Sequence, residues 1–301
     1  MKYAIHHILG FLEEWAPQST KLEYDNVGLL VGDGNQPVER ILTCLDVTPE
    51  VVDEAVETRT DLIIAHHPLI FRKLSRITPA DTTGSLLYRL IKADIGLIAA
   101  HTNLDAASEG VSFVLAERLG LKNQRFLKQD ESPVDVPPSG AGAGRTGGHT
   151  SRDAGSGTAG EAAEFPKATG FGVIGEFDQP LRPEEFLKHV AQQLDSRGIR
   201  YAGSPDEITR VAVCGGSGSF LKDEAVRQKA DAFVTADLKY HDFFLEAPDV
   251  LLVDAGHYES EVPVVGLLRD RLRNRFPGLA ISSTQVNTNP VRYFQDKTKQ
   301  E

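Results

Sequence analysis

The sequence predicts an α/β protein made of two similar α/β lobes with mixed, largely parallel sheets. Short runs rich in Val, Ile and Leu, each of strand length, alternate along the chain with segments whose apolar residues recur at helical spacing. This alternation occurs twice, once on each side of a stretch that is poor in apolar residues. Strand–helix alternation of this kind is typical of α/β units in which neighbouring strands pair in parallel.

Residues 1–121 form the first predicted lobe. The N-terminal stretch MKYAIHHILGFLEEWAP has the pattern of an amphipathic helix. Ser108 is placed to cap the last helix of this lobe, and Gly120 to end it. The strands after the N-terminal helix are predicted at 40–47, 61–68 and 93–101, and the helices at 49–57, 84–93 and 108–121.

Residues 122–167 are predicted to be a flexible insert between the lobes. From 128 to 164 the chain consists largely of Gly, Ser, Pro, Ala and charged residues and has almost nothing to bury. Such a segment cannot offset the conformational entropy that it would lose on ordering. His149 lies within the insert, and we expect its side chain to be solvated rather than to act as a ligand.

Residues 168–301 form the second predicted lobe. Ordered structure is predicted to resume at 168–177. The strands are predicted at 209–218, 231–238 and 250–257, and the helices at 183–194 and from near Tyr258 through VVGLLRDRLRNRF. Each predicted lobe has a buried strand that carries a histidine at its C-terminal end.

The composition indicates a soluble protein with an ordinary apolar core. The chain has 301 residues, of which 41% are hydrophobic, and a formal net charge of −11, which disfavours general nucleic-acid binding. The N-terminus does not have the pattern of a signal peptide, and no stretch approaches the roughly 18 apolar residues that span a bilayer. Cys44 and Cys214 sit in apolar runs and are predicted to be core thiols. We therefore expect a cytoplasmic protein with no membrane partner.

Two adjacent histidines, His66 and His67, directly follow a buried strand. Pro68 forces the chain to leave the strand at this point, so both side chains can face one small volume. The C-terminal edge of a parallel sheet is where α/β proteins place their sites. An isolated histidine pair is more typical of a surface dipeptide without a role, so the prediction depends on what lies nearby.

Two further strand ends carry the same kinds of side chain. His101 and Asp105 lie four residues apart after one strand, and His257 and Glu261 lie four apart in the first turns of a predicted helix, hence on one face. Imidazole and carboxylate ligands together suit Zn, Mn, Fe or Co better than Ca or Mg. Three of these histidines, His66, His67 and His257, together with the two carboxylates already exceed the needs of one tetrahedral zinc. We therefore predict two divalent metal ions with a bridging carboxylate or water. The predicted ligands are His66, His67, Asp105, His257 and Glu261.

The stretch VAVCGGSGSFLKDEAV reads as strand, glycine turn and helix. Backbone N–H groups at a helix N-terminus attract anions, so the turn is a candidate for binding a substrate phosphate. It matches neither the Walker pattern nor the dinucleotide fingerprint, and a plain tight turn is an equally good interpretation. The candidate substrate-binding residues are Gly215, Gly216, Ser217 and Gly218.

A polar cluster, TADLKYHDFF, follows another buried strand. His241 within it is a candidate general acid or base, and the alternative is a capped helix start whose histidine is merely polar. Near the N-terminus, Asp25 and Asn26 precede a short strand and fit turn chemistry and a pocket wall equally well.

These motifs together resemble the dinuclear-metal family of GTP cyclohydrolase I type 2 homologs, also called Nif-three-like proteins. The matching stretches are DNVGLLVGD, LDVTPEVVDEA, DLIIAHHPLIF, AHTNLD, TADLKYHDF, DAGHYESE and STQVNTNP, which leaves only 122–167 outside the resemblance. The resemblance implies two α/β lobes facing a shared metal cleft, two metal ions on the ligands given above with His101 close by, and a toroidal homohexamer. Some members of the family carry a folded domain between the halves, where this chain has the Gly/Ser-rich insert. The chain also has Ala236 and Glu109 where glycine is usual in the family.

The resemblance favours a metal-dependent hydrolase acting on a purine nucleotide, GTP. In this hypothesis metal-activated water attacks the guanine imidazole ring, His241 moves the proton and the glycine turn holds the triphosphate. Two alternatives remain open at this point: a two-metal phosphoesterase, and a non-catalytic metal-binding oligomeric scaffold or metallochaperone. The sequence does not choose among the metals, because histidine–carboxylate sites accept several.

Overall fold

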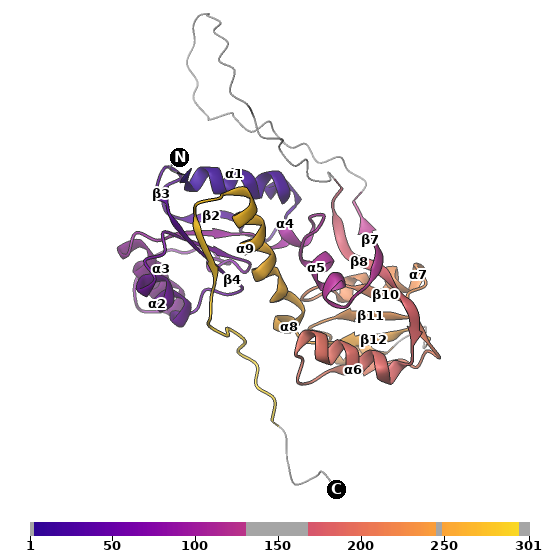
Figure 1. The fold of residues 1–301 in the computed structure, drawn as a ribbon. Coiled ribbons are helices and arrows are strands. Elements are labelled where there is room, and N and C mark those ends of the chain that lie inside the picture. The colour runs from indigo at the N-terminus through magenta and orange to yellow at the C-terminus, as the bar shows by residue number, and fades with distance from the viewer. Residues whose placement is uncertain (1–2, 131–167, 245–248, 295–301) are drawn as a thin grey trace, which may run out of the picture.

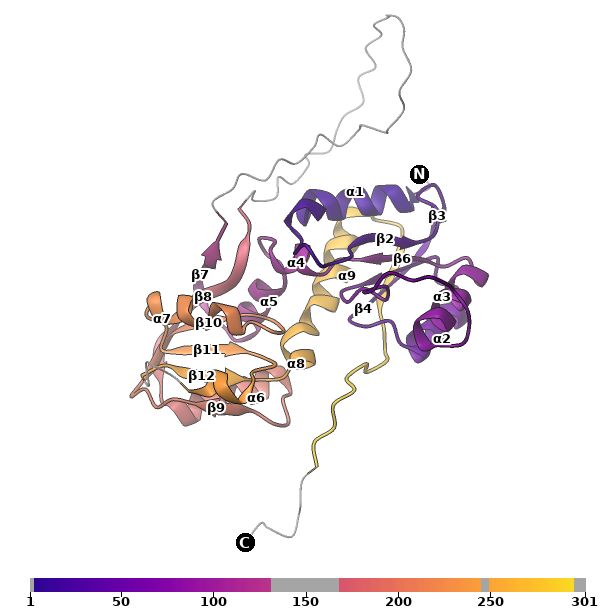
Figure 2. The ribbon, with the colours of Figure 1, turned by 180° about the vertical axis from the view of Figure 1, so that it is seen from behind.

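The structure is a computed structural model, and it describes residues 3–130, 168–244 and 249–294. Two larger sheets, each covered by helices on both faces, lie side by side in Figure 1, and Figure 2 shows the same arrangement from behind. Residues 131–167, which include His149 and most of the predicted insert, lie outside the described residues. In the part of the chain that is described, no helix has both the length and the apolar character needed to cross a membrane.

The five-stranded sheet has the order β13-β4-β5-β6-β2. Neighbouring strands pair in parallel, except that β2 is antiparallel to β6. The helices α1 and α9 pack on one face and α2 and α3 on the other. The strands are β13 Ala280–Ser283, β4 Arg40–Cys44, β5 Leu62–Ala65, β6 Gly96–Ala99 and β2 Gly28–Val31, and the helices are α1 Ile5–Trp15, α2 Pro49–Glu57, α3 Thr82–Lys92 and α9 Pro263–Arg275.

The six-stranded sheet has the order β7-β8-β10-β11-β12-β9, in which the β10-β11 and β11-β12 pairs are parallel and the others antiparallel. The helices α5 and α6 pack on one face, and α7 packs on the other. The strands are β7 Lys122–Gln129, β8 Gly170–Leu181, β10 Ile208–Val213, β11 Ala232–Thr235, β12 Leu251–Asp254 and β9 Arg200–Ala202, and the helices are α5 Val111–Arg118, α6 Pro183–Leu194 and α7 Lys222–Arg227.

The remaining elements are short. Strands β1 and β3 form a two-stranded antiparallel ribbon. Helix α4 follows β6 and helix α8 follows β12, so both lie at the C-terminal ends of buried strands. The bounds are β1 Tyr3–Ala4, β3 Pro37–Val38, η1 Gln18–Thr20, α4 Thr102–Asp105, η2 Ser219–Leu221, η3 Tyr240–Phe243 and α8 His257–Glu261.

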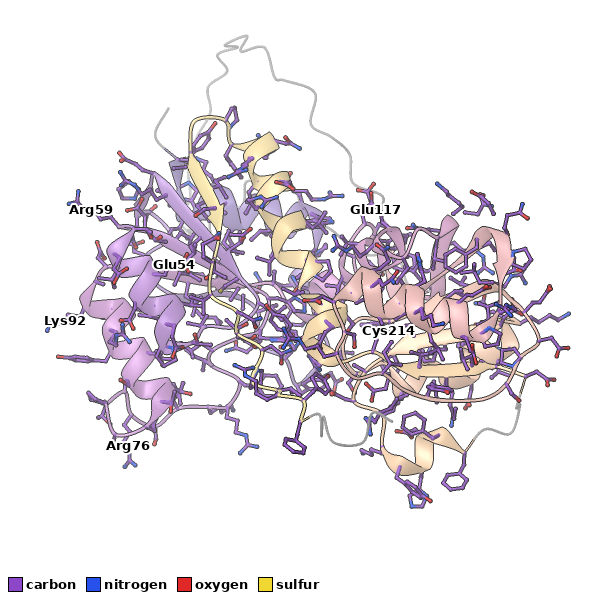
Figure 3. All side chains as sticks on the ribbon, turned by 60° about the horizontal axis from the view of Figure 1, so that its bottom comes forward. Glu54, Arg59, Arg76, Lys92, Glu117 and Cys214 are labelled. Atoms are coloured by element: carbon purple, nitrogen blue, oxygen red, sulfur yellow. The ribbon has the colours of Figure 1, made fainter. Side chains whose placement is uncertain are left out.

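The predicted mixed α/β class is confirmed. Every residue of β5, β6, β11 and β12 is buried, which explains why these strands appear in the sequence as continuous apolar runs. Figure 3 shows the charged side chains of Arg59, Arg76 and Lys92 pointing away from the sheets, whereas Cys214 lies inside. Both cysteines are buried and unpaired, as predicted, and burial raises the pKa of each thiol.

The chain crosses between the sheets in a way that the sequence did not predict. Helix α9 and strand β13, placed in the second lobe from sequence, belong to the five-stranded sheet, because Ile281 pairs with Ile41 of β4 and is buried in that sheet's core. Strand β7, placed in the insert, is the edge of the six-stranded sheet, where its Phe126 pairs with Val173. Ser108 does not cap α5, since its hydroxyl donates to the carbonyl of Ala168 and the helix begins one turn later.

Candidate metal centre

The histidine pair is held in place by the end of strand β5. The backbone N–H groups of His66 and His67 donate to the carbonyls of Cys44 and Leu45 at 3.1 and 2.9 Å, so the parallel ladder with β4 continues past the strand. The side chain of His66 is completely buried, while that of His67 is 23% exposed. The pair therefore presents one interior ligand and one ligand that faces the solvent-accessible side.

The buried histidine faces two carboxylates. His66 Nδ1 lies 2.8 Å from the carbonyl of Ala100, which leaves Nε2 pointing the other way. Nε2 lies 3.6 Å from Asp105 Oδ1 and 3.9 Å from Glu261 Oε2. Asp105 is the last residue of α4 and Glu261 the last of α8, so the strand ends of both large sheets meet here.

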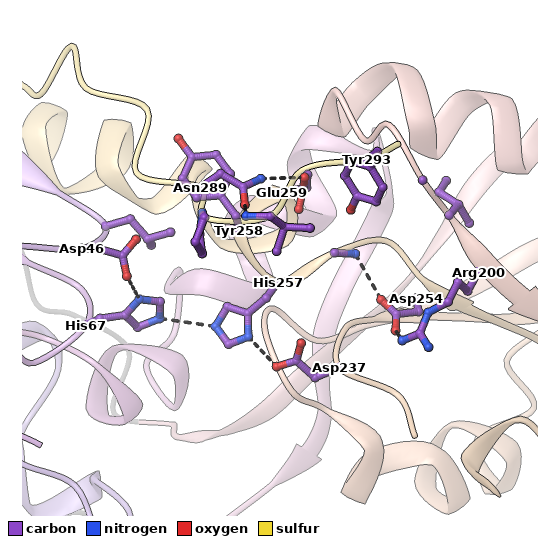
Figure 4. A pocket seen from close by; sticks show the side chains of 16 residues that line it. Asp46, His67, Arg200, Asp237, Asp254, His257, Tyr258, Glu259, Asn289 and Tyr293 are labelled. Carbon is purple, nitrogen blue, oxygen red and sulfur yellow. Dashed lines mark hydrogen bonds and ion pairs between the residues drawn. The ribbon is translucent and has the colours of Figure 1, made fainter. Parts of the chain in front are cut away.

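A second group of ligands surrounds the same oxygen of Glu261. His67 Nε2 and His257 Nε2 lie 2.9 and 3.0 Å from Glu261 Oε2, and 3.4 Å from each other. Figure 4 shows these two imidazoles facing each other across the junction between the sheets. Glu261 is therefore common to both groups.

Each of three histidines is oriented by a carboxylate behind it. His67 Nδ1 lies 2.7 Å from Asp46, His257 Nδ1 lies 2.7 Å from Asp237, and His101 Nδ1 lies 2.9 Å from Asp25. A hydrogen bond to a carboxylate at Nδ1 fixes the tautomer with a free lone pair on Nε2, as in histidines that bind metals. The sequence did not single out Asp46, although it follows β4 in the same way that the histidines follow β5.

The cluster leaves His66 Nε2 and Asp105 Oδ1 buried without a hydrogen-bond partner among the described residues, and leaves Glu261 Oε2 buried with only its ion-pair contacts to His67 and His257. Buried polar atoms without partners are rare, because each costs about 1–3 kcal/mol, and a missing ion is one explanation for them. Three sets of side chains have ligand atoms within 4.8 Å of one another: His66, His67 and His101; His67, His257 and Glu261; His66, Asp105 and Glu261. The residues present thus fit a transition-metal site, and the sequence-predicted ligands are brought together.

Burial and neighbouring charges shift the pKa values of the cluster residues in opposite directions. Burial lowers the pKa of His66 to about 3, which keeps its imidazole neutral. Burial, followed by the negative charge of Glu261, raises the pKa of Asp105 well above its usual value. Burial alone would raise the pKa of Glu261 as well. The hydrogen-bond contacts of Glu261 with His257 and His67 outweigh burial and lower its pKa.

The two more accessible histidines have raised pKa values. Burial lowers the pKa of His67, but contacts with Asp46 and Glu261 outweigh burial and raise it to about 9. His257 behaves in the same way, and its contacts with Asp237 and Glu261 raise its pKa to about 10. The metal-free cluster therefore carries two imidazolium groups at neutral pH.

The glycine turn packs against the cluster, and its N–H groups have acceptors inside the fold. The N–H groups of Gly216 and Gly218 donate to the hydroxyls of Ser260 and Thr235 at 3.0 and 2.9 Å. A Cβ at Gly216 would lie 2.0 Å from Glu261 Oε1, so glycine at this position leaves room for the carboxylate. Binding of a phosphate by this turn stays a prediction.

His241 lies on η3, where its side chain is exposed and its ring neighbours are Tyr240 and Phe244. Among the described contacts none joins it to the cluster, and its role in proton transfer stays a prediction. The residue of this stretch that does reach a predicted ligand is Asp237. Glu109, the departure from the family pattern, forms an ion pair with Arg271 of α9.

A pocket of about 630 Å³ opens beside His67 and His257. Such a volume is in the usual range for small-molecule sites. Figure 4 shows that its wall joins the two imidazoles and their carboxylates to Arg200, Tyr258 and Tyr293. A small molecule bound in the pocket would therefore contact the second group of ligands directly.

The chain is similar to known proteins along nearly its whole length. The family model described as Duf34/NIF3 (NGG1p interacting factor 3) matches residues 3–290. A protein of Staphylococcus aureus named GTP cyclohydrolase 1 type 2 homolog is 32% identical, with 96% of this chain and 100% of the relative covered. The crystal structure of a hypothetical protein from Staphylococcus aureus has a TM-score of 0.80 and 31% identity, covering 98% of this chain and 100% of that one. A Bacillus cereus protein related to NIF3 has a TM-score of 0.79 and 28% identity, covering 97% and 99%.

Proposed function

The chain belongs to the Duf34/NIF3 family, and from that premise we propose that it is a metal-dependent hydrolase that binds two divalent transition-metal ions and acts on a purine nucleotide such as GTP. The observation that carries the proposal is the convergence of three buried candidate ligand atoms, His66 Nε2, Asp105 Oδ1 and Glu261 Oε2, of which the first two have no hydrogen-bond partner among the described residues. A cluster built only for stability would pair these atoms with hydrogen-bond partners.

Two of the three sets of candidate ligands would serve one ion each. His66, Asp105 and Glu261 would hold one ion, and His67, His257 and Glu261 the other. When bound, two such ions supply Lewis acidity and a nucleophile at neutral pH. The chain contributes the orientation of the ligands, because Asp46 and Asp237 fix the tautomers of the two accessible histidines.

The substrate would occupy the pocket beside the accessible histidines. The rings of Tyr258 and Tyr293 offer apolar surface for a planar base, and the guanidinium of Arg200 offers a positive charge. Arg200 is held by Asp254, so this charge is fixed in position. We also expect a homo-oligomer, a hexamer by resemblance to the family, and light scattering on the purified protein would test this.

The proposal is tested with protein purified without chelators or a histidine tag. Elemental analysis should give about two transition-metal ions per chain. Incubation of GTP with the protein loaded with that metal should release formate. His66→Ala/Glu261→Ala should lose both metal and turnover. The chain offers a matched control in its other adjacent histidines, His6→Ala/His7→Ala on α1, which should keep both.

The outcomes separate the alternatives. Phosphate released without formate from a nucleotide panel would replace the proposed reaction with that of a phosphoesterase. Two bound ions with no turnover of any nucleotide would instead favour a non-catalytic metal carrier or scaffold. Wild-type turnover of GTP by His66→Ala/Glu261→Ala would contradict the proposal.

A further inference from the structure

The C-terminal segment, residues 284–294, runs along the junction between the two large sheets. It leaves β13 and appears in yellow in Figures 1 and 2. At its start Thr284 contacts Glu54 of α2, and at its end the ring of Tyr293 packs on Gly198, where a Cβ would lie 2.4 Å from the ring. The segment therefore contacts elements of both sheets.

The middle of this segment is hydrogen-bonded to the carboxylate behind His67. Asp46 uses one oxygen for each neighbour: Oδ1 lies 2.7 Å from His67 Nδ1, and Oδ2 accepts a hydrogen bond from Thr288 Oγ1 at 2.7 Å. A carboxylate held at both oxygens has little freedom to rotate. Thr288 thus holds the carboxylate of Asp46, which in turn orients the imidazole of His67.

The next residue reaches the helix that carries the other ligands. Asn289 Nδ2 donates to Glu259 Oε1 at 2.9 Å, and both side chains are buried. Glu259 lies on α8 between His257 and Glu261. Its other oxygen, Oε2, packs against Gly256, where an added Cβ would lie 2.2 Å from that oxygen. Asn289 therefore holds α8 through a buried carboxyl group that needs a hydrogen-bond partner.

We propose that Thr288 and Asn289 are positioning residues for the metal cluster, so that docking of residues 284–294 and metal binding stabilise each other. The inference rests on the metal binding proposed above but not on the reaction. Coupling between two binding events is reciprocal: if the docked segment increases metal affinity, bound metal must hold the segment in place to the same extent.

The first test measures metal affinity. Thr288→Val keeps the shape of the side chain but removes the hydroxyl, and we expect the Kd for Zn²⁺, from competition with a chromophoric chelator, to rise about tenfold, the lower end of what residues behind metal ligands contribute. Thr288→Ser should restore the wild-type Kd. Thr58→Val is the matched control, because the hydroxyl of Thr58 donates to the carbonyl of Glu54 on α2, outside both the C-terminal segment and the cluster, and its Kd should be unchanged.

The second test measures the reverse coupling in the unmutated protein, so it does not depend on a variant that folds. Zn²⁺ should slow amide hydrogen exchange in residues 284–294, including Val291, whose N–H is hydrogen-bonded to Asn289 Oδ1 at 2.9 Å. Equal Kd values for wild type, Thr288→Val and Thr58→Val, or exchange unaffected by Zn²⁺, would overturn the inference and leave the hydrolase proposal standing. Wild-type protein that binds no metal would overturn both, and metal binding without turnover would contradict only the reaction.

Discussion

Substitution of Gly216 by alanine should remove the metal while the protein still folds. Gly216 has φ +60°, and its added Cβ would lie 2.0 Å from Glu261 Oε1. Because Cβ atoms essentially never come closer than 3.0 Å to another atom, Oε1 would have to move by at least 1.0 Å, the difference between 3.0 and 2.0 Å. The carboxylate is rigid, so Oε2 would move with it. Metal–ligand distances tolerate only about 0.2 Å.

The Gly216→Ala substitution should weaken metal binding much more than it lowers the free energy of unfolding. The atom in the way is the tip of a side chain, which can rotate, so the fold loses only the cost of an alanine in the left-handed region, about 1–2 kcal/mol. Gly120 provides the matched control, since it has φ +78° and no atom within 4 Å of its added Cβ. Gly120→Ala therefore carries the same backbone cost with no collision.

The assay compares metal affinity and thermal stability in the two variants. Both should show a similar small fall in Tm when freed of metal. Only Gly216→Ala should lose affinity for Zn²⁺, by more than the 10–100-fold that residues behind metal ligands contribute, because Glu261 itself is displaced. Wild-type affinity in Gly216→Ala would refute the assignment of Glu261 as a ligand and the explanation given for the glycine.

Two further predictions concern protons and metal removal. Because His67 and His257 have pKa values of about 9 and 10, both are protonated at pH 7 without metal, so metal must displace their protons; affinity for Zn²⁺ should rise with pH up to about 10. Calorimetry in buffers of different ionisation enthalpy should detect at least two protons released at pH 7, one from each of these histidines, and no release would contradict the pKa assignment. Dialysis against a chelator should lower Tm, because an ion that binds only the folded state adds about 4 kcal/mol at a thousand times its Kd. Scanning calorimetry with and without added Zn²⁺ measures this, and identical transitions would argue against a metal at the cluster.

Much of the fold could be predicted because its strands are buried on both faces. The predicted helices at 49–57 and 183–194 coincide with α2 and α6, where apolar spacing and a proline in the first turn act together. Strand β7 could not be predicted in the same way. Its sequence, KNQRFLKQ, buries only Phe126 and Leu127, and it is recognisable as a strand only once β8 is beside it.

The candidate ligands that the structure brings together could be picked out from the sequence, but the residues that orient them could not. His66 and His67 are adjacent and follow one strand, which is a local pattern. Asp46 reaches His67 only because β4 and β5 are neighbours in the sheet, 21 residues apart in the chain. Thr288 is farther still, 242 residues from Asp46, and depends on a crossing of the chain that no local pattern specifies.

The charges around the cluster explain why protons and metal compete there. Five carboxylates surround the imidazoles: Asp25, Asp46, Asp105, Asp237 and Glu261. Without metal, protons supply the balancing positive charge: contacts with carboxylates raise the pKa values of His67 and His257, and burial, followed by the charge of Glu261, raises that of Asp105. The raised pKa values indicate that the fold favours positive charge at this place, and the buried atoms His66 Nε2 and Asp105 Oδ1, which have no hydrogen-bond partner among the described residues, indicate where it would be bound. A cation coordinated inside the cluster would both balance the carboxylates and give these buried atoms a partner.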